Sequence, residues 1–213
     1  FLTMVVMVPI ALCALGPLGN LIGSGIGSAL LALGGVGGFI AVALIAALWE
    51  FLVMSGMHLV LAVTMMTIIV TQGYEGLVSP AACCATVACM GMALGAALRL
   101  KDKDEKALNF GYFVSAFLGG VTEPALYGLA IKYKRPFVGL VIGAALGGAY
   151  AGLTHVNVYV MGSTNILLAI GYLGGGTANM VNGLISIAIS FVGAAIATYF
   201  LGFAKNEPAI QKQ

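Results

Sequence analysis

The chain has 213 residues, of which 61% are hydrophobic and 8% are charged, and its mean hydropathy is +1.09. Soluble domains contain about 45 to 50% apolar residues, so this composition excludes a soluble globular protein and indicates a membrane protein. The formal net charge of +2 gives no indication of nucleic-acid binding. The long apolar runs do not alternate as barrel strands would, which predicts an all-α membrane protein.

The first quarter of the chain is rich in glycine. Residues 3–30 are predicted to form one irregular spanning segment, because Pro17 and closely spaced glycines interrupt it. A second helix is expected from the glycines at 33–38 to about Trp49, an aromatic residue of the kind held at membrane interfaces.

The second quarter of the chain contains a further break. Residues 51–71 carry Gly56 and His58 in mid-run, which favours a broken, re-entrant hairpin over a clean span. Residues 76–98 are then expected to form a helix that ends at a basic loop.

The charges set the topology of the next segment. Lysine and arginine occur in three places, namely Arg99–Lys106, Lys132–Arg135 and the tail at Lys205 and Lys212. The positive-inside rule places all three in the cytoplasm, so residues 107–131 cannot make a single crossing. Glycines and Pro124 lie at the middle of this segment, in "GGVTEP", which predicts a second re-entrant hairpin. Its irregular tip should face a cavity, because such backbone is not tolerated against lipid.

The last third is expected to cross twice, at 136–153 and 180–203, with a polar, glycine-rich connection on the outer side. The sequence therefore predicts about five spanning helices and two re-entrant hairpins. Residues 1–204 are interpreted as one transport domain and 205–213 as a cytoplasmic tail or the start of a linker. Because the chain begins at Phe1 without a basic leader, it is expected to lack a signal peptide and to be part of something longer.

Glu123, at the centre of the second hairpin, is the leading candidate for function. An acidic residue within a membrane segment costs about 2.5 to 3.5 kcal/mol, so a functional reason is the default. Alternatively it caps backbone amides of the hairpin tip or pairs with Arg99. His58, in the other hairpin, is the second candidate, its alternative being a packing role. A carboxylate accepts hydrogen bonds and an imidazole donates or accepts them, so together they suit sugar hydroxyls.

Thr122 and Thr86 could add hydroxyl contacts, or each could hydrogen-bond along its own helix. His155 is assigned to the outer interface. The four cysteines, Cys13, Cys83, Cys84 and Cys89, lack neighbouring histidines, acids or basic residues at suitable spacing. They are therefore interpreted as reduced packing residues, and neither a metal site nor a reactive thiol is expected. The sequence has no nucleotide-binding loop, and no cofactor is expected.

The stretch "GGVTEPALYGLAIKYKRPF", residues 119–137, resembles the Glu-containing signature of enzyme IIC, the membrane component of bacterial phosphotransferase-system (PTS) sugar permeases. The similarity is to the β-glucoside, sucrose and trehalose branch of the glucose superfamily. Further pieces agree in order: "GPLGNLIGSGIG", "LVMSGMHLVL", "GYEGLVSPAA" and "LRLKDKDEKAL". The resemblance covers nearly the whole chain.

The resemblance implies a multi-pass permease of the cytoplasmic membrane that binds a sugar and presents it to a phosphocysteine on a separate enzyme IIB domain. Glu123 and His58 match the sugar-contacting positions, with Glu123 as the candidate catalytic residue, and Gly120, Thr122 and Pro124 shape the acidic hairpin. It also implies a homodimer through N-terminal helices that precede this segment in the family. The implied partners are thus a sugar, enzyme IIB, a second copy and the lipid bilayer.

Three positions depart from the family pattern. Leu59 stands where the family carries tryptophan after the histidine, and Thr86 and Cys89 stand where an asparagine and a glutamine are expected. These changes remove a stacking surface and two amides from the expected sugar site. Two rival functions remain at this point: an ion-coupled or facilitative sugar carrier without phosphorylation, and a membrane scaffold or receptor that does not transport.

Overall fold

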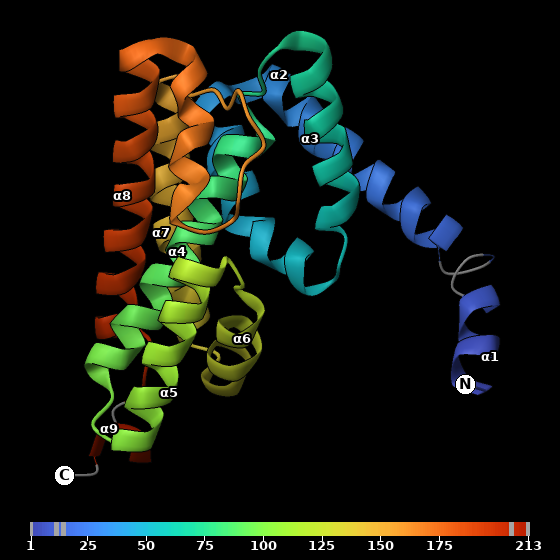
Figure 1. The fold of residues 1–213 in the computed structure, drawn as a ribbon. Helices are drawn as coiled ribbons and strands as arrows, with labels where there is room; N and C mark the ends of the chain where they lie inside the picture. The colour runs from blue at the N-terminus through green and yellow to red at the C-terminus, as the bar shows by residue number, and fades with distance from the viewer. Residues whose placement is uncertain (1, 11–12, 14–15, 205–206, 212–213) are drawn as a thin grey trace.

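The computed structural model describes residues 2–10, 13, 16–204 and 207–211 (Figure 1). Within these ranges the chain is helical, and the only strand-like pairing is an isolated antiparallel bridge between Glu75 and Val158. The all-α prediction is confirmed. The elements in chain order are α1 (Leu2–Ile10), α2 (Gly16–Met54), α3 (His58–Gln72), α4 (Val78–Arg99), α5 (Lys103–Val114), the π-type helix η2 (Ser115–Gly119), α6 (Glu123–Ala125), the π-type helix η3 (Leu126–Ile131), α7 (Pro136–Leu153), the 3₁₀ helix η4 (Ile166–Gly175), α8 (Gly176–Leu201) and α9 (Pro208–Gln211).

Three helical stretches in the described part are long and apolar enough to cross a membrane. They are Val78–Arg99, Pro136–Leu153 and Ile166–Leu201, and two shorter apolar helices cover Gly38–Met54 and His58–Gln72. The predicted helices at 76–98 and 136–153 correspond to α4 and α7. Together with the composition, these helices fit the predicted membrane protein.

Helices α4, α7 and α8 pack side by side in one bundle (Figure 1). α4 is buried along nearly its whole length. Gly91 and Gly95 lie directly against the backbone of α8, where a Cβ atom would collide with the carbonyl oxygens of Phe191 and Ala195. Small residues allow helix backbones to approach closely, which is how helices associate in a bilayer. The two hairpins pack against this bundle.

The predicted division of the first 50 residues is wrong in one respect and correct in another. Helix α1 ends at Ile10 and α2 begins at Gly16, so residues 3–30 are not one element, although residues 11–12 and 14–15 lie outside the described part. The helix expected after the glycines at 33–38 is present, since an apolar helix covers Gly38–Met54, the second part of α2. Gly38 has φ +41°, a left-handed conformation that interrupts the regular helical backbone at this point.

The predicted break within residues 51–71 is confirmed. Helix α2 ends at Met54, the chain turns at Ser55–Met57, and α3 begins at His58. Gly56 has φ +75°, a left-handed conformation that glycine adopts without steric cost. His58 therefore lies in the first turn of a helix that immediately follows a reversal.

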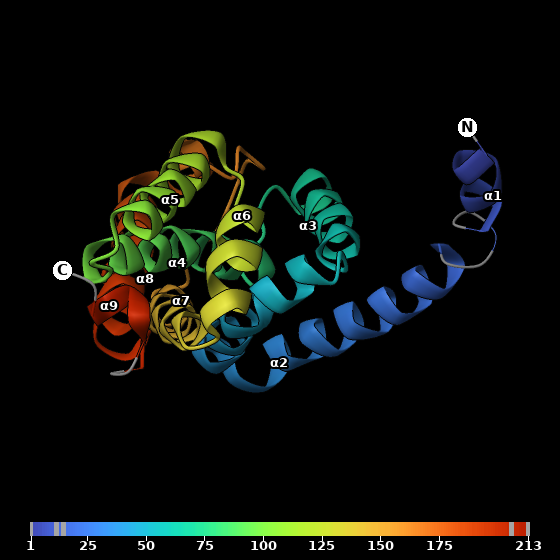
Figure 2. The same ribbon diagram turned by 90° about the horizontal axis from the view of Figure 1, so that it is seen from below.

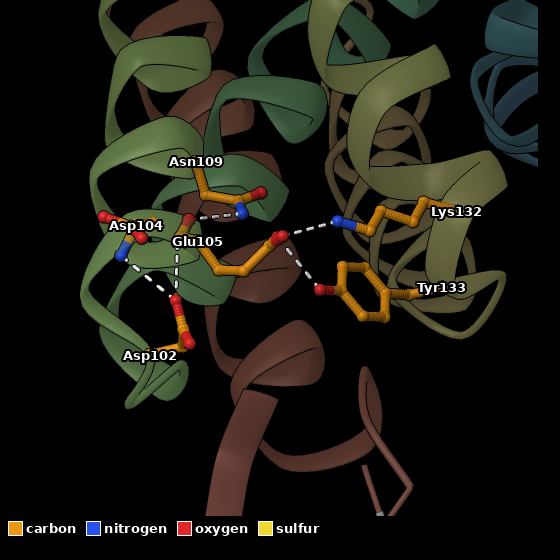
Figure 3. A network of polar contacts seen from close by, with 6 residues as sticks. All are labelled: Asp102, Asp104, Glu105, Asn109, Lys132 and Tyr133. Carbon is orange, nitrogen blue, oxygen red and sulfur yellow. Dashed lines mark hydrogen bonds and ion pairs between the residues drawn. The ribbon is translucent and has the colours of Figure 1, made fainter. Parts of the chain in front are cut away.

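The segment 107–131 reverses direction as predicted. Helix α5 and η2 run toward the middle of the molecule, the chain turns at residues 120–122, and α6 with η3 returns to the end from which α5 started (Figures 1 and 2). The base of this hairpin is closed by Glu105, which accepts hydrogen bonds from Lys132 Nζ at 2.5 Å and Tyr133 Oη at 2.9 Å (Figure 3). Both basic loops thus lie at one end of the molecule, as the charge pattern required.

The predicted outer connection after α7 does not stay at one end. From His155 the chain descends toward the middle, where Thr164 Oγ1 donates to the Gly120 carbonyl at 2.8 Å and Asn165 Nδ2 donates to the Leu118 carbonyl at 3.1 Å. Helix η4 then runs back to the end at which α7 finishes, and the chain turns at Gly176 into α8. The loop and η4 are drawn in orange in Figure 1. The tip of the acidic hairpin is therefore in contact with residues 158–165, which we name the descending loop.

Candidate functional site

One cavity of about 240 Å³ collects the sequence-predicted residues. Its lining includes His58, Thr86, Gly120, Thr122 and Glu123, which come from three separate segments of the chain. The sequence predicted a cavity at the tip of the acidic hairpin, and the structure brings all five residues to one cavity. Its size approaches that of small-molecule pockets, which hold about 300 Å³ or more.

The acidic hairpin presents Glu123 through its broken backbone. Gly120 has φ +73°, which reverses the chain, and Pro124 then supports a new helical turn that begins at Glu123. Thr122 is buried at this corner, and Thr164 of the descending loop holds the Gly120 carbonyl from the other side. The carboxylate of Glu123 is exposed and lines the cavity, so it is available to a ligand.

The alternative roles for Glu123 are not seen in the described part of the chain. Among the described residues, the Glu123 carboxylate forms no hydrogen bond with a tip amide and no ion pair, whereas Glu105 forms an ion pair with Lys132. Arg99 instead lies over the ring of Tyr199, 5.6 Å from its centroid. It follows Thr86 on α4 by thirteen positions, which corresponds to roughly 20 Å along the helix axis. Arg99 is thus a residue of the basic end and not of the cavity.

His58 faces the cavity from the first turn of α3. Its Nδ1 atom is buried without a hydrogen-bond partner among the described protein groups, which leaves it free to bond a ligand. The indole of Trp49 lies edge to face against the imidazole, with ring centroids 6.3 Å apart. The structure therefore contradicts the interface position predicted for Trp49, which is only 6% exposed and lines the cavity.

Other lining residues were missed by sequence reasoning. Ser79 of α4 has a buried hydroxyl with no protein partner in the described structure, and Ser163 and Thr164 reach the cavity from the descending loop. They join Thr86 and Thr122, the two hydroxyl residues that the sequence predicted. None of the three missed residues carries a local signal, because small hydroxyl residues are equally common in helix packing. Their place in the lining is evident only from the three-dimensional structure.

The lining has the chemistry of a site for a neutral polyol. A carboxylate accepts hydrogen bonds, an imidazole donates or accepts, and hydroxyls do both, while the Trp49 indole offers a flat apolar surface. Among the residues that the structure describes, no lysine or arginine belongs to the lining. The described residues also contain no cluster of three or more metal-ligating side chains.

The comparisons with known proteins agree with this geometry. The family model for the EIIC component of the phosphotransferase system matches residues 1–148, which is more than half of the chain. The chain belongs to the phosphotransferase system EIIC family. The family match includes His58, Thr86, Gly120, Thr122 and Glu123 of this EIIC chain, and it ends before the descending loop. The family predicted from the sequence is therefore confirmed.

Curated relatives of the EIIC chain carry sugar names. It is 31% identical over 203 residues to the arbutin-, cellobiose-, and salicin-specific EIIBC component of Escherichia coli K12, covering 95% of this chain and 42% of the relative. It is 33% identical to the sucrose-specific EIIBC component of Bacillus subtilis 168, covering 97% and 44%, and 33% identical to the β-glucoside-specific EIIBCA component of the same strain, covering 92% and 32%. The chain thus spans less than half the length of these relatives. No solved structure matches it.

The position of Trp49 in the EIIC cavity gives a first testable prediction. Replacing Trp49 with alanine should weaken the binding of a ligand in this cavity roughly 5- to 10-fold, because the ligand would lose one apolar face of the site. Leu48→Ala is the matched control, since Leu48 precedes Trp49 on α2 and is 46% exposed. Equilibrium binding to the purified full-length protein measures the effect. Equal ligand affinities of the two variants would show that Trp49 is not part of the binding site.

Proposed function

We propose that this EIIC chain is the substrate-binding part of a sugar permease of the phosphoenolpyruvate-dependent phosphotransferase system. It binds a sugar, carries it inward across the bacterial cytoplasmic membrane and presents it to phosphorylated enzyme IIB. The observation that carries the proposal is the convergence of Glu123 and His58 on one cavity, at the tips of two chain reversals. Discontinuous helices of this kind form the binding sites of many transporters.

The proposed substrate is a glucoside or a related disaccharide. The relatives are named for arbutin, cellobiose, salicin, β-glucosides and sucrose, and each of these compounds contains a glucosyl unit. A neutral cavity with an acceptor carboxylate, an imidazole and several hydroxyls is compatible with such a ligand. Trp49 would take the place of the stacking residue that Leu59 does not supply, since Leu59 is 63% exposed and outside the lining.

Glu123 is proposed to act on the hydroxyl that receives the phosphoryl group. Its carboxylate accepts the hydrogen bond of that hydroxyl and takes its proton as the oxygen–phosphorus bond forms. The sulfur–phosphorus bond of the enzyme IIB phosphocysteine breaks in the same transfer. Phosphoryl transfer depends chiefly on positioning and electrostatics, so one oriented carboxylate is suited to this role. His58, Thr122 and Thr86 would orient the sugar.

The proposed assembly is a multi-pass homodimer in the bacterial inner membrane, with enzyme IIB docking at the basic end. That end carries the loops at 99–106 and 132–135, which the hairpin base joins through Glu105 and Lys132 (Figure 3). The hydrogen bond to Glu105 raises the pKa of the Lys132 ammonium, so its positive charge is secure at physiological pH.

A phosphorylation assay tests the proposed function. The full-length protein in lipid vesicles, supplied with the phosphoenolpyruvate relay and a panel of salicin, cellobiose, arbutin and sucrose, should form sugar phosphate from at least one of them. Uptake without sugar phosphate would indicate a facilitative or ion-coupled carrier. Sugar binding without uptake would indicate a receptor. Either of these two outcomes contradicts the proposal.

A further inference from the structure

The cavity extends along one face of α4. Its lining includes Ser79, Ala82, Cys83 and Thr86, and residues spaced by three, four and seven positions share one face of an α-helix. With a rise of about 1.5 Å per residue, Ser79 and Thr86 lie roughly 10 Å apart along the helix axis. The cavity is therefore long enough to have two distinct ends.

The tip of the acidic hairpin lies at the Thr86 end of the cavity. Cys89 follows Thr86 by three positions, and its thiol donates to the Thr122 carbonyl at 3.9 Å. Glu123 follows Thr122 directly, and both line the cavity. Ser79 lies ten positions before Cys89, so the cavity has a Glu123 end and a Ser79 end.

The descending loop runs in the same direction as α4. At its start, Val158 and Glu75 exchange two backbone hydrogen bonds of 2.8 Å, and Glu75 lies four positions before Ser79. At its end, Thr164 donates to the Gly120 carbonyl of the hairpin tip at 2.8 Å. Because Val158 and Thr164 both line the cavity, the loop passes from the Ser79 end to the hairpin tip.

Helix α3 forms a third wall. His58 and Met65 line the cavity from positions seven residues apart on this helix. Just after the helix, the ring of Tyr74 contacts the ring of Tyr159 in the first part of the descending loop, with centroids 5.9 Å apart. The C-terminal end of α3 thus lies toward the Ser79 end of the cavity, and Met65 is nearer to that end than His58.

The Ser79 hydroxyl has no structural use. It is buried, and its oxygen has no hydrogen-bond partner among the described protein groups. Hydroxyls such as those of Thr64 and Ser190 donate to a carbonyl one turn earlier in their helices, but Ser79 is the second residue of α4 and has no such turn before it. The start of α4 is capped instead by the Glu75 carboxylate, which accepts from the backbone N–H groups of residues 77–79. An unpartnered buried hydroxyl is unfavourable, so its place in the lining indicates a ligand group that bonds to it.

The surroundings of this hydroxyl are apolar. Met65 and Val158 are each 3% exposed and line the cavity, as does Ala82 on the same face of α4. A second sugar ring would leave several hydroxyl groups unpaired against such a surface, which reduces affinity. An aromatic ring with one hydroxyl group fits better, because its faces are apolar, the Met65 thioether favours aromatic contacts, and its hydroxyl pairs with Ser79.

We propose that the Ser79 end is a second subsite, which binds the aglycone of an aryl glucoside whose ring carries a hydroxyl group. Ser79 is the specificity-determining residue of this subsite, and Met65 and Val158 form its apolar surface. The inference rests on the proposed function, since it takes the glucosyl ring to lie between Glu123 and His58. It adds the chemistry of the second ring and favours an aryl glucoside over a disaccharide.

A ligand series tests the subsite in the wild-type full-length protein. Methyl β-glucoside lacks a second ring, phenyl β-glucoside adds an apolar ring, and arbutin and salicin add a hydroxyl or hydroxymethyl group to that ring. Isothermal titration should show that phenyl β-glucoside binds roughly 5-fold more tightly than methyl β-glucoside, and that arbutin or salicin binds roughly 3- to 10-fold more tightly again.

Four results of this series would overturn the proposal. They are the absence of binding by every glucoside, equal affinities for the methyl and phenyl glucosides, no gain in affinity for arbutin or salicin over phenyl β-glucoside, and tighter binding of cellobiose than of all three aryl glucosides. None of these measurements depends on the folding of a variant.

Ser79→Ala assigns the preference to the hydroxyl. The variant should bind arbutin and salicin no more tightly than phenyl β-glucoside, and its affinities for the methyl and phenyl glucosides should stay within about twofold of the wild type. Its melting temperature should be unchanged or higher, because the substitution removes an unpartnered hydroxyl. Ser186→Ala is the matched control, since Ser186 is equally buried, donates to the Gly183 carbonyl at 2.7 Å and lies outside the lining, so the preference should persist.

The role of Ser79 is contradicted if Ser79→Ala keeps the preference for arbutin or salicin, or if it loses affinity equally for all four glucosides. Failure of the proposed function would appear separately, as binding of these glucosides without any sugar phosphate in the phosphorylation assay.

Discussion

Replacing Glu123 with glutamine is expected to weaken sugar binding by roughly 10- to 100-fold while leaving the protein folded. A hydrogen bond to a charged acceptor contributes about 1.5 to 3 kcal/mol, and glutamine keeps the shape of the side chain but not the charge. Glu123 is exposed and forms no hydrogen bond or ion pair with another described residue. The substitution should therefore reduce the affinity for the ligand and leave the stability of the fold unchanged. Isothermal titration of salicin, cellobiose and sucrose into the full-length protein measures it.

Glu105→Gln provides the matched control for this experiment. Glu105 lies on the same hairpin, at its base, where it holds Lys132 and Tyr133 and does not line the cavity (Figure 3). An exposed pair of this kind contributes about 1 kcal/mol or less to stability, so this variant should bind sugar within about twofold of the wild type. If Glu123→Gln binds as tightly as Glu105→Gln, the acidic hairpin is not the sugar site.

Replacing Gly120 with alanine is expected to reduce sugar binding more than 10-fold and to lower the melting temperature. Gly120 has φ +73°, and a left-handed backbone costs a residue with a Cβ roughly 1 to 2 kcal/mol. The new Cβ would also lie 2.6 Å from Thr164 Oγ1 and 2.9 Å from the Asn165 backbone nitrogen, so the descending loop would have to move. Binding and thermal unfolding of the full-length protein measure the two effects.

The neighbouring Gly119→Ala variant controls for composition and helix propensity. A Cβ at Gly119 would meet only the Val121 side chain, at 3.9 Å, so this variant should keep both its sugar affinity and its melting temperature. If the two alanine variants behave alike, the contact between the hairpin tip and the descending loop is unimportant for the site.

The acidic hairpin could be predicted because its determinants are local. Two basic loops on either side of residues 107–131 fixed the position of both ends, and "GGVTEP" marked the reversal. The same holds for α7, whose predicted range of 136–153 agrees with the structure because Pro136 starts the helix and polar residues follow it. Charge placement and backbone-breaking residues are readable without tertiary contacts.

The remainder of the site depends on contacts that sequence order does not show. Thr164 and Gly120 are 44 positions apart, and no local pattern indicated that residues 158–165 would leave the outer side and reach the hairpin tip. Trp49 was misplaced because tryptophan is favoured both at membrane interfaces and in binding sites, and only burial distinguishes the two.

The central claim is that a sugar binds between the acidic hairpin and His58, and a structure of the full-length protein with a bound glucoside tests it most directly. The claim predicts sugar hydroxyls within hydrogen-bond distance of the Glu123 carboxylate and the His58 imidazole, with Trp49 against the sugar ring. A sugar bound elsewhere, with Glu123 turned toward lipid or paired with a cation, would contradict it.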